Sequence, residues 1–287
     1  MKKRPLSLLA ALLLTTACAT TRSVRDSVQP APPFAPAEVS APAEPASPTF
    51  SLFPQLKTSA AHIATAPLRW EGSDWTKFGL GVAAVGGALL LDKDLRQVVD
   101  RNSSGTLGRV AEGVAPFGAE YSFGALGAFY LAGRYLKDDT ARAVAEDGLV
   151  SSLIAAGVVS PILKATIGRR RPSQTGEIFA RGSGGVSFPS GHTTQAFAVA
   201  SVVAAHYASP WIKVAAYGIA GLVGLSRMEQ GAHYASDVLA GALIGVAIGH
   251  AVVRLHDSER LRVSVVPSAS PRARGVALSF RLDLGNR

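Results

Sequence analysis

Hydrophobic and polar residues follow one another in blocks along this chain rather than alternating singly. Six blocks rich in Ala, Gly, Leu and Val lie between residues 77 and 253, and charged or turn-forming residues bound each of them. Blocks of this length favour helices over strands. The predicted helices cover residues 77–91, 118–136, 148–163, 193–208, 212–225 and 238–253. The pattern therefore predicts an all-α fold, a six-helix bundle, in a domain over residues 69–256.

Three residues refine the boundaries of these predicted helices. Ser190 and Ser236 precede the fourth and sixth helices, where a hydroxyl can accept hydrogen bonds from the free amides of a first turn. Pro210 separates the fourth helix from the fifth. It predicts a tight antiparallel connection, because proline cannot continue a helix from its interior.

The C-terminal residues 257–287 have a different pattern. Alternate positions near the end are apolar, namely Val276, Leu278, Phe280, Leu282 and Leu284. A turn-forming stretch precedes them, so this segment predicts a short C-terminal β-hairpin. We expect the hairpin to close an edge of the bundle, and docking to a membrane or a partner is the alternative.

The N-terminal residues 1–17 have the features of an export signal. A basic start precedes a short apolar run over residues 6–14, and small residues then lead to Cys18. This arrangement resembles a bacterial lipoprotein signal, and Cys18 is the only cysteine of the chain. We expect Cys18 to be lipidated and the protein to be exported to the cell envelope, with plain secretion or an uncleaved anchor as alternatives. Residues 18–68 are rich in Pro and Ala and predict a disordered tether.

Composition narrows the class of protein and of partner. The 287 residues are 48% hydrophobic and include 29 glycines, which favours closely packed helices in a membrane or in a dense soluble bundle. The net charge of +9 suits anionic partners such as phosphates or acidic lipid surfaces. Aromatic residues do not interleave with the basic clusters, and the spacing of a zinc finger is absent from the sequence, so nucleic acid is not an expected partner.

Three short motifs carry candidate chemistry, and each lies at the end of an apolar block. They are KATIGRRRP over residues 164–172, PSGH over 189–192 and SRMEQGAHYASD over 226–237. Arg171 and Arg227 offer planar forks for phosphate oxygens, and Lys164 adds a point charge. Lys164 and Arg171 are seven residues apart, so they could share one face if the helix continues to Pro172.

The other two motifs supply candidate reactive groups. Ser190 and Gly191 predict a loop that enters a helix, where first-turn amides can approach an anion, and His192 would lie beside it. His233 and Asp237 are four residues apart, so a carboxylate can bind one ring nitrogen and leave the other as a nucleophile or base. The remaining histidines, His62, His206, His250 and His256, lack partners at such spacing, and we expect packing or solvent-facing roles for them.

The three motifs together resemble those of the type 2 phosphatidic acid phosphatase and vanadium haloperoxidase superfamily. The resemblance covers about residues 148–253 and matches every specified position. It implies that His233 attacks phosphorus to form a phosphohistidine, that Asp237 orients His233, and that His192 protonates the leaving oxygen and later activates water. It also implies that no metal or other cofactor is needed. The residues that would hold the phosphate are Lys164, Arg171, Ser190, Gly191 and Arg227.

Whether the helices span a membrane is a separate question. The fourth predicted helix has about 16 residues, roughly 24 Å, which is less than the ~30 Å hydrocarbon core, and the fifth is no longer. A cleaved export signal with six spans would also place the motif loops in the cytosol, whereas membrane relatives face their sites outward. We therefore expect a helical bundle outside the cytoplasm, periplasmic and tethered through Cys18, with an integral membrane protein as the alternative.

The expected activity is metal-independent hydrolysis of phosphomonoesters or lipid (pyro)phosphates. A vanadate-dependent haloperoxidase is the enzymatic alternative, although residues 192–227 leave room for little more than a helical hairpin. A non-enzymatic protein that binds anionic lipid is the other alternative. Simple anion binding needs no nucleophile, so His192, His233 and Asp237 favour the enzyme.

Overall fold

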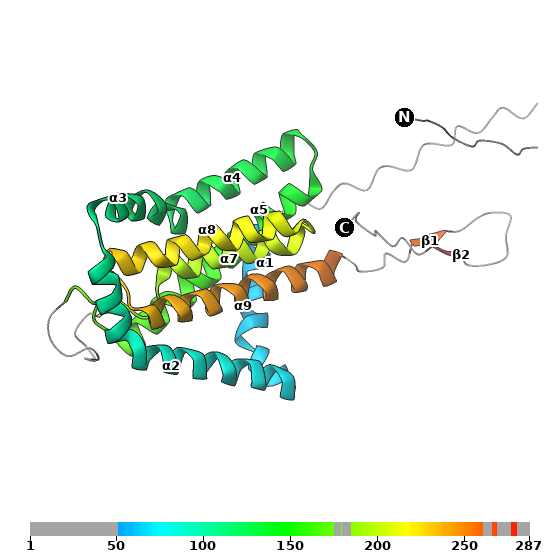
Figure 1. Ribbon diagram of the computed structural model, residues 1–287. Coiled ribbons are helices and arrows are strands. Elements are labelled where there is room, and N and C mark those ends of the chain that lie inside the picture. Colours follow the sequence, from blue (N-terminus) through cyan, green and yellow to red (C-terminus); the bar gives the residue numbers. More distant parts are fainter. Residues whose placement is uncertain (1–50, 175–178, 180–184, 261–265, 269–276, 280–287) are drawn as a thin grey trace, which may run out of the picture. The chain divides into compact units, whose positions relative to one another are not determined.

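The computed structural model describes residues 51–174, 179, 185–260, 266–268 and 277–279. Figure 1 shows a set of helices from α1 to α9, and short segments join them except between α6 and α7. The long helices are α2 (Gly72–Asn102), α4 (Glu120–Tyr135), α5 (Asp139–Ile154), α7 (Gly191–His206), α8 (Pro210–Glu229) and α9 (Ala235–Arg260). The shorter ones are α1 (Leu52–Ala64), α3 (Gly105–Val114), α6 (Ser160–Ile167) and the 3-10 turns η1 (Ala66–Arg69) and η2 (Ala115–Gly118).

The described part of the chain is mostly helical, as the hydrophobic blocks predict, but the predicted count of six helices is too low. Each predicted helix falls largely within α2, α4, α5 with α6, α7, α8 or α9. Helices α1 and α3 were not predicted. Helix α1 also corrects the predicted tether over residues 18–68, because residues 52–64 of that segment are helical. Residues 1–50, with the predicted export signal and Cys18, lie outside the described residues.

Helices α5 and α6 are parts of one longer helical stretch. A π-helical segment, η3 (Ala155–Val159), joins them. Pro161 follows in the first turn of α6, and proline cannot donate the amide hydrogen bond of a regular helix. The wider π turn lets the chain pass this residue without ending the helix.

Helix α7 is the central helix and packs against α5, α8 and α9. Its contact with α9 is close because glycines line the facing side of α9. A Cβ atom on Gly245 would lie 2.5 Å from the backbone oxygen of Thr194, and Gly241 and Gly249 face similar contacts. A larger residue at these positions would force α7 and α9 apart, so the glycines set their distance.

A buried polar cluster fastens α1 to the end of the bundle that holds His206 and His256. Asp147 on α5 accepts hydrogen bonds from His206 Nε2 at 2.7 Å and from His256 Nδ1 at 2.6 Å. The other ring nitrogen of His256 lies 3.1 Å from the hydroxyl of Ser59 on α1. The order Ser59, His256, Asp147 is that of a hydrolase triad. Ser59 is fully buried, however, so no substrate reaches its hydroxyl and the cluster serves packing.

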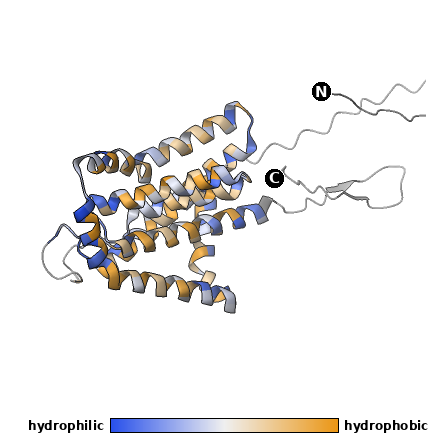
Figure 2. Ribbon diagram, in the orientation of Figure 1, coloured by the Kyte–Doolittle hydropathy of each residue, from blue (hydrophilic) through white to orange (hydrophobic). Residues whose placement is uncertain are grey.

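The outer faces of the helices carry many exposed apolar side chains. Exposed large side chains run along α2, α4 and α8, including Leu90 at 85%, Leu131 at 53% and Trp211 at 80% exposure. Figure 2 shows hydrophobic residues along the length of α2 and α8 and hydrophilic residues towards helix ends. Two stretches, Asp139–Ile167 and Ala235–Ser258, are long and apolar enough to cross a membrane by length and composition.

The structure also corrects the length argument against membrane spans. Helix α7 has the predicted 16 residues, but α8 has 20 residues and is about 30 Å long. Helix α2, with 31 residues, is longer still, at about 46 Å. Helix length therefore does not exclude helices that span a membrane.

Two short strands follow α9 in the sequence. Strand β1 (Val266–Ser268) pairs antiparallel with β2 (Ala277–Ser279), and Pro267 lies opposite Leu278. Helix α9 continues to Arg260, so the tail begins later than the predicted residue 257. The rest of the predicted hairpin, at residues 261–265, 269–276 and 280–287, lies outside the described residues.

Candidate active site

The structure brings the three sequence motifs together at one end of the bundle, where α6, α7, α8 and α9 begin or end. Lys164 on α6 donates to the backbone oxygen of Pro189 at 2.7 Å, which ties the first motif to the second. The amide of Ser190 donates to the backbone oxygen of Asp237 at 3.0 Å, which ties the second to the third. Residues far apart in sequence therefore share one site.

The hydrogen bonds of His233 define which of its ring nitrogens is available for chemistry. His233 lies in the loop before α9 and is buried, and its Nδ1 is 2.7 Å from the backbone oxygen of Ser187. A carbonyl oxygen only accepts hydrogen bonds, so Nδ1 carries the proton and Nε2 presents a lone pair. Burial lowers the pKa of His233, against the opposing effect of Asp237, and keeps the ring neutral near pH 7.

Asp237 supports this arrangement less directly than the sequence predicts. Its Oδ2 lies 3.7 Å from Nδ1 of His233, beyond hydrogen-bond distance, and accepts from the Ser187 hydroxyl at 2.6 Å. It also accepts from the amide of Tyr234 at 2.9 Å, so this carboxylate caps the first turn of α9. The predicted direct bond between Asp237 and His233 is thus replaced by two contacts of Ser187. Its backbone oxygen accepts from Nδ1 of His233, and its hydroxyl donates to Asp237.

Arg169 and Asp92 belong to the site although no sequence motif identifies them. Arg169 is 2% exposed, and its guanidinium forms ion pairs with both Asp92 and Asp237. Asp92, on α2, also accepts from the amide of Ser236 at 2.9 Å. Ser236 therefore lies inside the first turn of α9 and is held by Asp92, rather than being the predicted N-cap.

The predicted shared helical face of Lys164 and Arg171 does not form. Helix α6 ends at Ile167, and Gly168 adopts the left-handed conformation with φ of 62°, which turns the chain. Arg171 is therefore in the following loop. Lys164 instead binds the loop before α7, through the backbone oxygens of Val186 at 2.5 Å and Pro189 at 2.7 Å.

The buried Nε of Arg169 has no partner among the described residues, although its terminal nitrogens pair with Asp92 and Asp237. Two other arginines also present buried donors with no partner in this part of the chain. These donors are Nε of Arg171 and Nε of Arg227. Burial lowers the pKa of Arg227, and the positive charge of Arg171 lowers it further because the two guanidinium groups repel each other. A buried unsatisfied donor is costly unless something binds it, and two cationic donors together suit an anion.

His192 lies in the same field of positive charge, in the first turn of α7. Burial lowers its pKa to about 4, and the charges of Arg227 and Lys164 contribute in the same direction. An anion that neutralises these charges would raise the pKa of His192 again. The positive charges that lower this pKa therefore favour an anion beside His192.

Ser190 and Gly191 occupy the start of α7 as predicted, next to Lys164. The Ser190 hydroxyl accepts a hydrogen bond from Thr193 at 2.9 Å and makes no capping bond to a helix amide. A Cβ atom on Gly191 would meet only Cε of Lys164, at 3.9 Å. That distance is an ordinary van der Waals contact, so Gly191 places the start of α7 directly beside the lysine side chain.

No group of three or more His, Cys, Asp or Glu side chains that could hold a metal ion occurs within the described residues.

Comparisons with known proteins match the segment of the chain that contains these site residues. Residues 148–260 match the model of the PAP2 superfamily, and all eight predicted catalytic and phosphate-binding residues lie in this segment. The chain is 38% identical over 106 residues to the lipid A 1-phosphatase of Porphyromonas gingivalis, covering 35% of this chain and 22% of that protein. It is 34% identical over 104 residues to the lipid A 1-phosphatase of Rhizobium etli, covering 34% of this chain and 44% of that protein. The chain thus spans less than half the length of either relative.

A solved structure shows a similar arrangement of helices. It is the first transmembrane PAP2 type phosphatidylglycerolphosphate phosphatase from Bacillus subtilis, with a TM-score of 0.50 and 24% sequence identity. The likeness covers 66% of this chain and 96% of that chain. At 24% identity, this similarity supports a similar fold and nothing beyond the fold.

Proposed function

Because residues 148–260 belong to the PAP2 superfamily, we propose that this protein is a lipid phosphatase that releases inorganic phosphate from a phosphorylated lipid. The observation that carries the proposal is the state of His233. The carbonyl of Ser187 fixes the proton on Nδ1 and leaves Nε2 as a neutral nucleophile. The unpartnered Nε donors of Arg171 and Arg227 supply the positive charge that a phosphoryl group needs.

The proposed reaction has two steps. In the first, Nε2 of His233 forms a bond to phosphorus while the bond from phosphorus to the lipid oxygen breaks, and that oxygen takes a proton from His192. In the second, a water molecule gives its proton to His192 and attacks phosphorus, which breaks the bond to His233 and releases inorganic phosphate. Bound phosphate raises the low pKa of His192, so this residue can carry the proton of the first step.

Holding the phosphate is the proposed role of five residues. The transferring group spreads its charge over three oxygens, so several fixed donors are needed around it. The residues proposed for this role are Lys164, Arg171, Ser190, Gly191 and Arg227. No step of the scheme requires a metal ion.

The substrate class follows from the relatives and from the surface of the molecule. Both relatives named above are lipid A 1-phosphatases, which favours a phosphorylated glycolipid or another lipid phosphate. Exposed apolar faces as large as those of α2, α4 and α8 are unfavourable in water and mark contact with a membrane. We therefore favour the integral membrane alternative over a bundle held only by lipid on Cys18. Lipidation of Cys18, cleavage of residues 1–17 and a periplasmic location remain predictions.

Phosphate release from the purified protein in lipid nanodiscs tests the proposal. The substrates are an aryl phosphate, phosphatidic acid, lipid A and a polyprenyl pyrophosphate, each with EDTA present. We expect release from at least one lipid substrate, and we expect His233→Ala to abolish it. His62→Ala, on α1, is the matched control and should retain full activity. Undiminished release by His233→Ala would refute the covalent scheme.

A further inference from the structure

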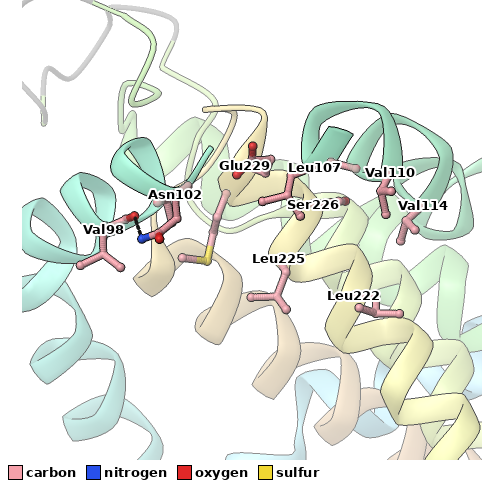
Figure 3. Close-up of a pocket in the computed structure, with 12 residues that line it drawn as sticks. Val98, Asn102, Leu107, Val110, Val114, Leu222, Leu225, Ser226 and Glu229 are labelled. Carbon is pink, nitrogen blue, oxygen red and sulfur yellow. Dashed lines mark hydrogen bonds between the residues drawn. The ribbon is translucent and has the colours of Figure 1, made fainter. Parts of the chain in front are cut away.

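An apolar pocket of about 330 Å³ lies between α2, α3 and the C-terminal end of α8. Figure 3 shows Val98 and Asn102 on one side, Leu107, Val110 and Val114 on another, and Leu222 and Leu225 on α8. Nearly all of these side chains are valine or leucine. The described catalytic residues do not line this pocket, so it has no role in the reaction steps given above.

The polar groups that line the pocket already make hydrogen bonds within the protein or carry negative charge, so they do not favour a phosphate. Asn102 Nδ2 donates to the backbone oxygen of Val98 at 2.7 Å, drawn as a dashed line in Figure 3. The hydroxyl of Ser226 donates to the backbone oxygen of Val223 at 2.7 Å. The carboxylate of Glu229, also in the lining, would repel a phosphate. The chemistry of the pocket therefore suits a hydrocarbon chain.

The pocket is adjacent to the phosphate site through α8 and α2. Ser226 and Met228 line it, and they flank Arg227 in the sequence. Val99 and Met228 also line a small hollow that is bounded by His233. Arg96 on α2 donates to the backbone oxygen of Met228 at 2.7 Å, which holds this part of α8 against α2. Val99 and Met228 are the two residues that line both the pocket and the hollow beside His233. The methionine side chain is flexible and can adapt to a ligand.

The pocket also opens to the apolar outer surface. Leu222 is 52% and Leu225 is 61% exposed, and both belong to the row of exposed apolar residues on α8. A chain can thus pass from a bilayer into the pocket without crossing polar groups. Its volume is at the small end of the range for ligand sites, which suits one chain rather than several.

We propose that this pocket holds one hydrocarbon chain of the lipid whose phosphate binds at His233. The inference rests on the proposed lipid phosphatase function and adds to it a site that selects substrates by chain length. Each buried methylene contributes about 0.8 kcal/mol, which is about fourfold in affinity. The rate should therefore depend steeply on chain length until the pocket is full.

A series of linear alkyl phosphates, from butyl to dodecyl, measures this dependence. In wild-type protein in nanodiscs, kcat/KM should rise with chain length. Leu222→Trp fills the pocket and should lower kcat/KM for dodecyl phosphate at least tenfold while leaving butyl phosphate unchanged. Val214→Trp, at an exposed position of α8 outside the pocket lining, is the matched control and should behave as wild type. An unchanged chain-length profile in Leu222→Trp, or an equal loss in Val214→Trp, would overturn the inference.

Photo-crosslinking separates failure of the pocket from failure of the proposed reaction. Dodecyl phosphate with a diazirine at the chain end is bound to wild-type protein and to His233→Ala, and adducts are mapped by mass spectrometry. We expect adducts within residues 98–114 and 222–229, and Leu222→Trp should remove them. Such adducts without phosphate release would support the pocket and refute the phosphatase. Phosphate release with adducts spread evenly over the outer faces of α2, α4 and α8 would support the phosphatase and refute the pocket.

Discussion

Arg169 donates through Nη2 to Oδ2 of Asp92 at 2.6 Å, and both side chains are almost completely buried. The other terminal nitrogen of the same guanidinium forms an ion pair with Asp237. The ring of Tyr234 lies against this guanidinium, with its centroid 4.2 Å from Cζ. Helix α2 is therefore joined to the site that contains His233, although α2 lies outside the segment that matches the PAP2 superfamily model.

The buried ion pair predicts a large loss of stability for Asp92→Asn. The change keeps the shape of the side chain but leaves Arg169 with one balancing carboxylate in place of two. Removing one partner of a buried pair costs about 3–5 kcal/mol, and we expect a value near the lower end because Asp237 remains. Chemical unfolding of the purified protein measures this difference.

Asp100→Asn is the control for that measurement. Asp100 is on the same helix and pairs with Arg96, but its side chain is 52% exposed. Exposed pairs contribute little, so the variant should unfold close to wild type. Equal effects of the two substitutions would contradict the assigned role of Asp92.

Arg169→Lys tests whether this residue positions the reactive groups or only stabilises the fold. Lysine keeps the charge but cannot bind Asp92 and Asp237 at once through a planar fork. We expect kcat to fall about tenfold or more, equal to a rise of about 1.4 kcal/mol in the barrier, with KM nearly unchanged. A purely structural role would lower the amount of folded protein and leave kcat of the folded fraction unchanged.

The sequence predicts which motifs come together better than it predicts the contacts that their residues make. The three motifs do meet, because each lies at a helix end and the helices are antiparallel neighbours. The apolar blocks also predict α2, α4, α5 with α6, α7, α8 and α9, because each block is long enough for a helix. Spacing along the chain could not reveal that Ser187 would take the place of Asp237 at Nδ1 of His233.

Residues that were missed depend on tertiary packing. Arg169 is one of three consecutive arginines, and no local pattern shows which of them is buried. Asp92 carried a usable signal, since an acidic residue directly after the apolar run of its helix is costly to bury without a partner. No local pattern predicts helix α1, because its stabilising contacts, such as that of Ser59 with His256, join residues 197 positions apart.

The unpartnered donors of Arg171 and Arg227 predict the affinity for phosphate analogues. Arg227→Met removes a charged donor while keeping an apolar stem of similar length. Hydrogen bonds to charged groups contribute about 1.5–3 kcal/mol, so we expect the inhibition constant of vanadate to rise about tenfold to 100-fold. Arg134→Met, an exposed arginine of α4, should leave inhibition unchanged. An unaltered inhibition constant in Arg227→Met would place the phosphate elsewhere.

The low pKa of His192 predicts that anion binding takes up protons. In the empty site this pKa is about 4, below the usual 6.5, so the ring is neutral at pH 6. A bound dianion raises the pKa, and the protein then gains a proton between about pH 4 and pH 6.5. Anion affinity should therefore increase as the pH falls through this window. Sulfate is a suitable probe because it does not itself titrate there.

Calorimetry of sulfate binding at pH 6 in two buffers of different ionisation enthalpy counts the protons taken up. His192→Asn should reduce this number, and His62→Ala should not. Equal proton uptake by wild type and His192→Asn would show that another group carries the effect.

Trapping of the phosphorylated enzyme tests the central claim most directly. Wild type and the variants His233→Ala and His192→Ala are each mixed with a lipid phosphate that is turned over, quenched in alkali and examined by mass spectrometry. We predict phosphate on the peptide that contains His233 and none in His233→Ala. In His192→Ala both the formation and the loss of this phosphate should be slower, because His192 is the acid of the first step and the base of the second. Turnover by wild type with no phosphate on His233, together with activity in His233→Ala, would contradict the account.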